Sequence, residues 1–355
     1  MEKEEMLRQM STRLKGIPEE EQDELIQMYR DLFQVANENG KKDDDVIHAL
    51  TSSHSKQIVM EGVFQMKKYS AGIRIGVSIL LTFVIMAVVI GVLAALGRMD
   101  DLFSNYPFMM MMAFVLAIPA TILPLVMFKM WDQKNPWKIG WHFKKKDMIF
   151  SVVAVLLSFT CVISFILILD GMDRIEAGML SFNQVKFSIF LIACIGYFFA
   201  ALKEEVLVRA YFMSNLSKLG MVKMILISSI LFTCLHFPTG GIDPFRMGSW
   251  FVGGLVFAYI YLKSGSVVVA TVVHAVHNLV NDMAIHGAEG VAIFTLNQTV
   301  SLSDKLFYEV ALGLILVVLT YGFYGKNGVF TPAQNLIELW GHKPKEKNDA
   351  FQTAG

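Results

Sequence analysis

The sequence predicts an all-α fold: a polytopic membrane helix bundle of about eight transmembrane helices, preceded by a small helical unit. Hydrophobic residues make up 54% of the 355 positions and charged residues only 17%, which is too apolar for an ordinary soluble protein. The apolar residues also fall in runs of roughly twenty, the length that a helix needs to cross about 30 Å of hydrocarbon. A closed barrel would show alternating apolar and polar residues instead.

Eight apolar runs define the predicted spans, and the fifth to the seventh are the shortest. The runs are Ile75–Leu96, Pro107–Phe128, Met148–Leu169, Phe187–Leu202, Val222–Phe237, Phe245–Leu262, Ser266–Met283 and Leu306–Tyr324.

Basic residues predict the orientation of the spans. They gather before the first span and in alternate loops, at Lys67, Lys68, Arg74, Lys129, Lys134, Lys138, Lys144, Lys145, Lys146, Lys218, Lys223 and Lys263. The opposite loops hold acidic residues and few basic ones, at Asp100, Asp101, Asp170, Glu176, Asp243 and Glu289. Because cytoplasmic loops are enriched in Lys and Arg, both termini are expected in the cytoplasm, as an even number of spans requires.

Five regions follow from this layout. Residues 1–68 are expected to form a cytoplasmic helical unit, because Glu2–Leu14 and Glu19–Ala36 have helical spacing and a third helix follows Asp45. The other regions are 69–186 with three spans and a basic loop, 187–285 with the polar clusters described below, 286–325 with an outer loop and the last span, and 326–355 as a cytoplasmic tail. A cap that assists folding or association is the simpler interpretation of the first unit, and a regulatory module is the alternative.

Other features exclude several classes of protein. The net charge is zero, and no nucleic-acid partner is expected. Cys161, Cys194 and Cys234 lie in predicted spans without CxxC spacing, which is typical of small core residues and not of a disulfide framework. The chain begins with charged residues, so we expect no cleavable signal peptide.

Two ionisable residues stand at matching positions in a predicted helical hairpin. Glu204 and His236 are 32 positions apart, and the midpoint, Gly220, lies in the break between the two helices. In an antiparallel hairpin both would lie about 24 Å from the turn, at one depth. A carboxylate that faces an imidazole can take a proton from a water held between them.

The next two polar pairs have helical spacing. His274 and Asn278 are four residues apart, so they share a helix face, and their N–H groups could stabilise an oxyanion in a site shielded from water. Glu205 and Arg209 are also four apart and are expected to pair, which would leave Glu204 free.

Each cluster has a simpler explanation by itself. Glu204, Glu205 and Arg209 could be an interfacial salt bridge, His236 could sit at the outer interface, and His274 with Asn278 could be an interhelical hydrogen-bonding pair. Ionisable residues within lipid-spanning helices are nevertheless rare and usually functional. All three clusters in this order favour one hydrolytic site.

The three clusters resemble the signature motifs of the CPBP family of intramembrane proteases, which includes type II CAAX prenyl endopeptidases and bacteriocin self-immunity (Abi) proteins. The motifs are Glu204-Glu205-x-x-x-Arg209, Phe232-x-x-x-His236 and His274-x-x-x-Asn278. The resemblance covers roughly Phe187–Met283 and implies that 187–285 is a catalytic core. It implies water activation by Glu204 with His236, an oxyanion site of His274 and Asn278, and supporting roles for Glu205 and Arg209.

The resemblance leaves open whether the site holds a metal ion. The expected mechanism has no metal and no cofactor, with a glutamate-activated water. A zinc ion held by Glu204, His236 and His274 is the alternative, although the sequence contains no HExxH helix.

The expected function is that of an endopeptidase in a bacterial plasma membrane, acting on a membrane-associated peptide or protein, prenylated substrates included, in contact with membrane lipid. One alternative is a non-proteolytic binding protein such as an immunity factor or scaffold. Another is a proton-coupled transporter, which the lack of a convincing internal repeat disfavours.

Overall fold

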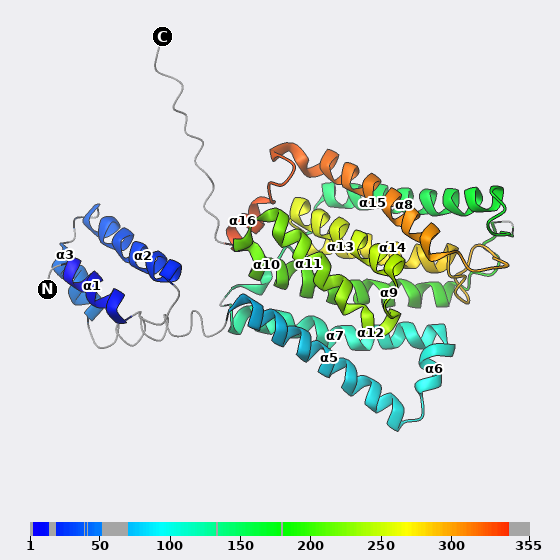
Figure 1. Cartoon of the computed structure of the whole chain (residues 1–355), viewed down its shortest axis with the longest axis horizontal. Coiled ribbons are helices and arrows are strands. Elements are labelled where there is room, and N and C mark those ends of the chain that lie inside the picture. The colour runs from blue at the N-terminus through cyan, green and yellow to red at the C-terminus, as the bar shows by residue number, and fades with distance from the viewer. Residues whose placement is uncertain are drawn as a thin grey trace, which may run out of the picture. The chain divides into compact units, whose positions relative to one another are not determined.

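The fold was taken from a computed structural model, which describes residues 3–13, 19–38, 40, 42–51, 70–132, 134–178 and 180–340. The chain divides into two compact units, residues 1–69 and 70–355. Both are built from helices (Figure 1), and an isolated bridge pairs Ala177 with Leu296. The predicted all-α class is confirmed. Lys67, Lys68 and the end of the predicted tail, 341–355, lie outside the described residues.

The first unit contains α1 (Lys3–Arg13), α2 (Glu19–Glu38) and α3 (Asp43–Thr51). The third helix starts three residues before the predicted point, since three consecutive aspartates form its first turn and suit the positive end of the helix dipole. Met6, Phe33, Val46 and Ile47 form a buried cluster in this unit.

The second unit holds the apolar helices and the predicted site. Its helices are α5 (Ala71–Ala95), α6 (Met99–Ser104), α7 (Tyr106–Met130), α8 (Lys145–Gly171), α9 (Phe187–Glu204), α10 (Met213–Leu216), α11 (Met221–Leu235), α12 (Phe237–Gly240), α13 (Pro244–Ser264), α14 (Val267–Ala284), α15 (Leu302–Tyr324) and α16 (Gln334–Trp340). A π-helical segment, Glu205–Phe212, joins α9 to α10.

Among the described residues of this unit, seven helices are long and apolar enough to cross a membrane: α5, α7, α8, the continuous helix Phe187–Leu219, α13, α14 and the helix Leu302–Asn327. The fifth predicted span, Val222–Phe237, corresponds to α11, which has only 15 residues and a length of about 22 Å. Large apolar side chains such as Leu80, Val88 and Val318 are exposed on the outside of the bundle, as lipid-facing residues are. The chain is therefore a multi-pass membrane protein.

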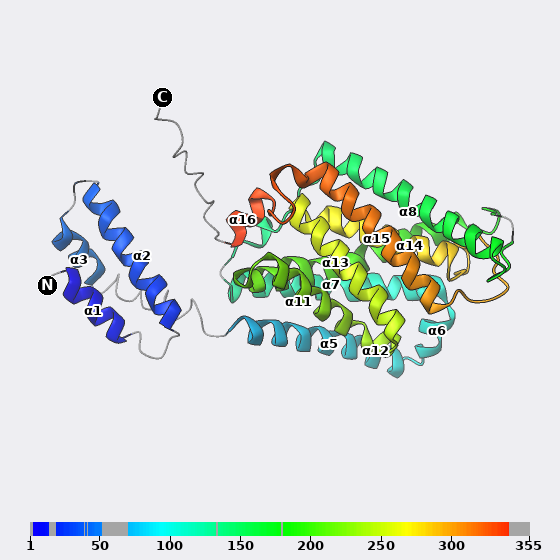
Figure 2. The same ribbon diagram turned by 45° about the horizontal axis from the view of Figure 1, so that its top comes forward.

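Charged segments gather at opposite ends of the helical bundle. In Figures 1 and 2 the start of α5 and α16 lie at one end, and α6 and the loop before α15 lie at the other. The lysine-rich segment between α7 and α8 and Lys263 belong to the first end, whereas Asp100, Asp101 and Glu289 belong to the second. The assignment of the basic end to the cytoplasm stays a prediction.

The packing of α9 and α13 within the bundle positions the site. Helix α9 packs against α7 and α14, and α13 packs against α11, α14 and α15. Helices α13 and α11 approach closely at Gly254, where an added Cβ would lie 3.0 Å from Cβ of Ser229 on α11. Such small residues let helix backbones approach each other in membranes.

Candidate active site

Glu204 and His236 meet inside the bundle, as the hairpin spacing predicts. Glu204 is the last residue of α9 and His236 follows α11 directly. The distance from Oε2 of Glu204 to Nε2 of His236 is 3.8 Å, and the two side chains are 22% and 23% exposed. Both groups are thus accessible while most of their surface is covered.

The tautomer of His236 follows from its second ring nitrogen. Nδ1 lies 2.8 Å from the carbonyl oxygen of Phe232, one turn earlier in α11, and a carbonyl can only accept a hydrogen bond. Nδ1 therefore carries the proton. In the neutral ring, Nε2 then presents a lone pair towards Glu204.

His274 joins the same site from the middle of α14. Its Nε2 lies 3.8 Å from Oε2 of Glu204, the same oxygen that faces His236. On the other edge of the ring, Nδ1 donates a hydrogen bond of 2.9 Å to Oε1 of Glu205. One imidazole is thus held between two consecutive carboxylates.

The π-helical segment makes this arrangement possible. It starts at Glu205, directly after Glu204, and π-turns within α-helices are frequent at functional sites because they change the angle between successive side chains. Both glutamates can therefore face His274, although consecutive residues of an α-helix are about 100° apart.

The predicted pair of Glu205 and Arg209 is present. Nε of Arg209 lies 3.3 Å from Oε2 of Glu205, and both side chains are 0% exposed. The guanidinium also lies over the ring of Phe232, 4.6 Å from its centroid. A buried charge is unfavourable without a partner, so this pair compensates the second carboxylate of the site.

The expectation that Glu204 would be free is wrong. Nζ of Lys203 donates a hydrogen bond of 2.9 Å to Oε1 of Glu204. Helical spacing predicts pairs between residues one turn apart, whereas this ion pair joins sequence neighbours. A lysine and two glutamates directly after the apolar run Phe187–Leu202 were the signal that could have indicated it.

Asn278 lies one turn after His274 in α14 and is half-buried. Its side chain makes no hydrogen bond to another residue in the part of the chain that the structure describes, and its amide is therefore available to a ligand. The shared helix face predicted for His274 and Asn278 matches their positions in α14.

Aromatic side chains that the sequence analysis missed fix both imidazoles. Phe257 of α13 stacks on His274 with ring centroids 4.2 Å apart and an interplanar angle of 17°. Trp250 of the same helix lies 5.2 Å from the ring of His236. Apolar residues on a predicted span give no signal for such a role, because lipid contact and core packing favour the same residue types.

A second buried histidine–carboxylate pair also escaped the sequence analysis. Nε2 of His277 lies 3.2 Å from Oε2 of Glu309, and Glu309 belongs to α15. The isolated carboxylate in the last predicted span was the available signal. Phe257 separates this pair from the first site, since its ring contacts both His274 and His277.

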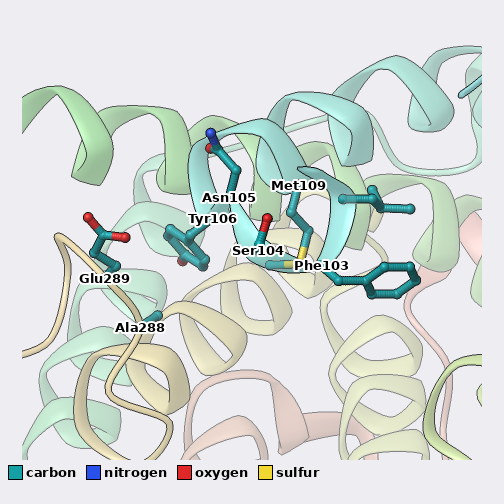
Figure 3. A pocket seen from close by; sticks show the side chains of 8 residues that line it. Phe103, Ser104, Asn105, Tyr106, Met109, Ala288 and Glu289 are labelled. Atoms are coloured by element: carbon teal, nitrogen blue, oxygen red, sulfur yellow. The ribbon is translucent and has the colours of Figure 1, made fainter. Parts of the chain in front are cut away.

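A surface pocket lies away from these groups, at the acidic end of the bundle. Figure 3 shows Asn105, Tyr106 and Met109 at the start of α7 opposite Ala288 and Glu289 of the loop before α15. None of the predicted site residues lines this pocket.

The fold and these contacts define a class of protein: a multi-pass membrane protein with an ionisable carboxylate–imidazole cluster inside its helix bundle. Residues 186–280 match the family model described as Rce1-like, type II CAAX prenyl endopeptidase. The match spans α9 to α14 and contains every residue of the three motifs, which confirms the resemblance for this part of the chain. It supports an intramembrane endopeptidase of the CAAX type that acts on membrane-associated proteins. No curated protein and no solved structure matches the chain.

Proposed function

We propose that this protein hydrolyses peptide bonds of membrane-associated substrates with a water activated by Glu204 and His236. The observation that carries the proposal is the convergence of two Nε2 atoms, those of His236 and His274, on Oε2 of Glu204 at 3.8 Å each. A distance of 3.8 Å is too long for a direct hydrogen bond, and a water about 2.8 Å from each atom can bridge the gap.

In this proposal, Oε2 of Glu204 and Nε2 of His236 act as the two acceptors for the water. A bridging water would donate one hydrogen to Oε2 of Glu204 and the other to Nε2 of His236. Its oxygen lone pairs then remain free for the carbonyl carbon of the substrate. Glu204 accepts the proton as the bond forms and can return it to the leaving amine, as a general base that becomes a general acid does.

His274 and Asn278 are proposed to stabilise the oxyanion. Because Nδ1 of His274 donates to Glu205, the neutral ring has no proton on Nε2, and only the imidazolium donates from both nitrogens. The oxyanion role therefore belongs to the doubly protonated ring, whose Nε2–H can donate to the substrate oxygen. The amide of Asn278 would supply a second donor.

Zinc is the alternative to a metal-free mechanism, with Glu204, His236 and His274 as its ligands. In a tetrahedral zinc site the nitrogen and oxygen ligands are about 3.4 Å apart. Oε2 of Glu204 lies 3.8 Å from Nε2 of His236 and of His274, so these side chains would have to move slightly closer together to bind the ion. The ion would polarise the carbonyl and activate the water. We prefer the glutamate mechanism because the described residues contain no group of three His, Cys, Asp or Glu side chains placed to hold a metal ion.

The test uses the full chain in lipid nanodiscs with quenched peptides, prenylated and unprenylated, anchored in the same bilayer. We expect wild type to cleave at least one of them, with or without a chelator, and Glu204→Gln to reduce the rate by about 10²- to 10⁴-fold. Activity lost with the chelator and restored by zinc would favour the metal mechanism. A folded wild type that cleaves none of the peptides would favour a membrane binding protein.

A further inference from the structure

A polar junction lies at the basic end of the bundle, where α5 begins and α7 ends. Nη1 of Arg74, in the first turn of α5, donates to Oδ1 of Asp132, two residues after the last residue of α7. The Arg74 side chain is 17% exposed and the Asp132 side chain 4%. The carboxylate is thus the more deeply buried partner, and the guanidinium, which has five donors, keeps part of its surface accessible.

Lys134 brings a second cation to this junction. Its Nζ donates a hydrogen bond of 2.8 Å to Oγ of Ser214 on α10 and lies 5.9 Å from the centre of the Phe128 ring. The backbone N of Lys134 also donates to the carbonyl oxygen of Phe128. These contacts fix the lysine at the junction, but neither Ser214 nor Phe128 carries a charge.

The charges of these groups do not balance. Asp132 pairs with Arg74, and no carboxylate of the described residues forms an ion pair with Lys134. Burial lowers the pKa of Lys134, the charge of Asp132 opposes this effect, and the charge of Arg74 adds to it. A partly buried ammonium is unfavourable without a counter-charge. An anion from outside the chain would supply that charge.

The position of the junction indicates which anion is available. Helix α5 starts at Ala71 and α7 ends at Met130, so the junction lies where two apolar helices reach the basic end of the bundle (Figure 1). Lipid headgroups lie at the ends of membrane spans, and basic pockets between helices bind anionic headgroups. The N-terminus of α5 adds positive partial charge at the same level.

We propose that Arg74 and Lys134 bind the phosphate of an anionic lipid headgroup at the junction of α5, α7 and α10. A guanidinium can hold two phosphate oxygens, and an ammonium binds phosphate as a point charge. Asp132 holds the guanidinium from its buried side and cancels one of the two positive charges. The site therefore favours a headgroup with a net negative charge over a zwitterionic one, whose own cation it repels.

This binding site goes beyond the proposed hydrolysis and does not depend on it. Ser214 belongs to the continuous helix Phe187–Leu219, which also carries Glu204. A bound phosphate would hold Lys134 against Ser214, and so would connect the end of this helix to the starts and ends of its neighbours. Lipid binding can be measured without any substrate.

The experiment uses the full chain in a non-ionic detergent, with phosphatidylglycerol and phosphatidylcholine of identical acyl chains as the probes. Native mass spectrometry gives the number of lipids bound, and the rise in unfolding temperature with lipid concentration gives the affinity. Wild type should bind the first phosphatidylglycerol about 10-fold more tightly than phosphatidylcholine, as expected for hydrogen bonds between charged groups. Equal affinity for the two lipids overturns the proposal.

Variants at Lys134 assign the preference to this site. Lys134→Met should bring the ratio of the two affinities close to one, and Lys134→Arg should retain most of it. The matched control is Lys138→Met, which removes the same charge from an exposed position of the same loop and should keep the wild-type ratio. An equal loss in both methionine variants overturns the proposal, because the preference would then reflect net charge alone.

A second variant tests the guanidinium without leaving a buried carboxylate unpaired. Arg74→Gln combined with Asp132→Asn removes both charges of the ion pair and should also bring the ratio close to one. This double variant decides the question if Lys134→Met does not fold, which unfolding without added lipid reveals. A wild-type ratio in the folded double variant overturns the role of Arg74.

Inorganic phosphate and glycerol phosphate distinguish a lipid from a free phosphate. If the junction binds a lipid, both solutes should compete with phosphatidylglycerol only weakly, because they lack the acyl chains that pack along α5 and α7. Competition by either solute at the affinity of the lipid itself overturns the assignment to a lipid.

Discussion

Nδ1 of His274 donates a hydrogen bond of 2.9 Å to Oε1 of Glu205, which joins two helices across 69 positions of the chain. The bond lies at the start of the π-helical segment and in the middle of α14, and both side chains are buried. It fixes the plane of the imidazole and directs Nε2 towards Glu204. Glu205 thus positions a proposed catalytic group through one oxygen, while its other oxygen faces Arg209.

Removal of Arg209 should destabilise the bundle strongly. Arg209→Met leaves Glu205 as a buried charge with one compensating partner fewer, and breaking a buried ion pair typically lowers the free energy of unfolding by about 3–5 kcal/mol. Thermal unfolding in detergent measures the effect. Glu205→Gln combined with Arg209→Met should recover part of the loss, because no uncompensated carboxylate remains. A single variant as stable as wild type would contradict the role assigned to this pair.

Asn278→Ala should reduce the rate of hydrolysis without lowering the stability of the fold. Its amide has no hydrogen-bond partner among the described residues, so the substitution removes no structural contact of that kind. If the amide stabilises the oxyanion only in the transition state, kcat should decrease by about 10²- to 10³-fold with little change in KM. Steady-state hydrolysis of a cleavable anchored peptide gives both constants. An increased KM at unchanged kcat would assign Asn278 to substrate binding instead.

Gly140→Ala should disrupt the contact between the loop before α8 and the turn between α13 and α14. Gly140 has a positive φ of 94°, and an added Cβ would lie 1.9 Å from the carbonyl oxygen of Gly265. The hydrogen bond from N of Val267 to O of Gly140 would be strained as well. A lower unfolding temperature is expected. The matched control is Gly76→Ala in α5, where an added Cβ meets nothing within 4 Å.

Glu309→Gln tests whether the second histidine pair is structural. The substitution keeps the shape of the side chain and removes the charge that faces His277 at 3.2 Å. We expect the free energy of unfolding to decrease by about 1–3 kcal/mol, because a buried partner of His277 is weakened. The kcat of hydrolysis should stay nearly unchanged, since Phe257 separates this pair from His274. A selective loss of kcat at normal stability would place the pair in the reaction instead.

Several parts of the site could be predicted because they depend on local spacing. The equal distance of Glu204 and His236 from Gly220 predicts that they meet in an antiparallel hairpin. In the structure, Oε2 of Glu204 lies 3.8 Å from Nε2 of His236. The four-residue spacing of Glu205 and Arg209 likewise predicts their contact. The bond between Glu205 and His274 could not be predicted this way, because it depends on how α9 packs against α14.

The sequence by itself determined the helical class, the apolar runs and the candidate residues, because hydropathy, length and helical periodicity are properties of short segments. Only the tertiary structure decided that α11 is too short for a full span, that Lys203 occupies one oxygen of Glu204, and that Glu309 of α15 pairs with His277. These features depend on the π-helical turn and on contacts between helices far apart in the chain. Such contacts are selected by the packing of the whole bundle, which no local pattern of residues records.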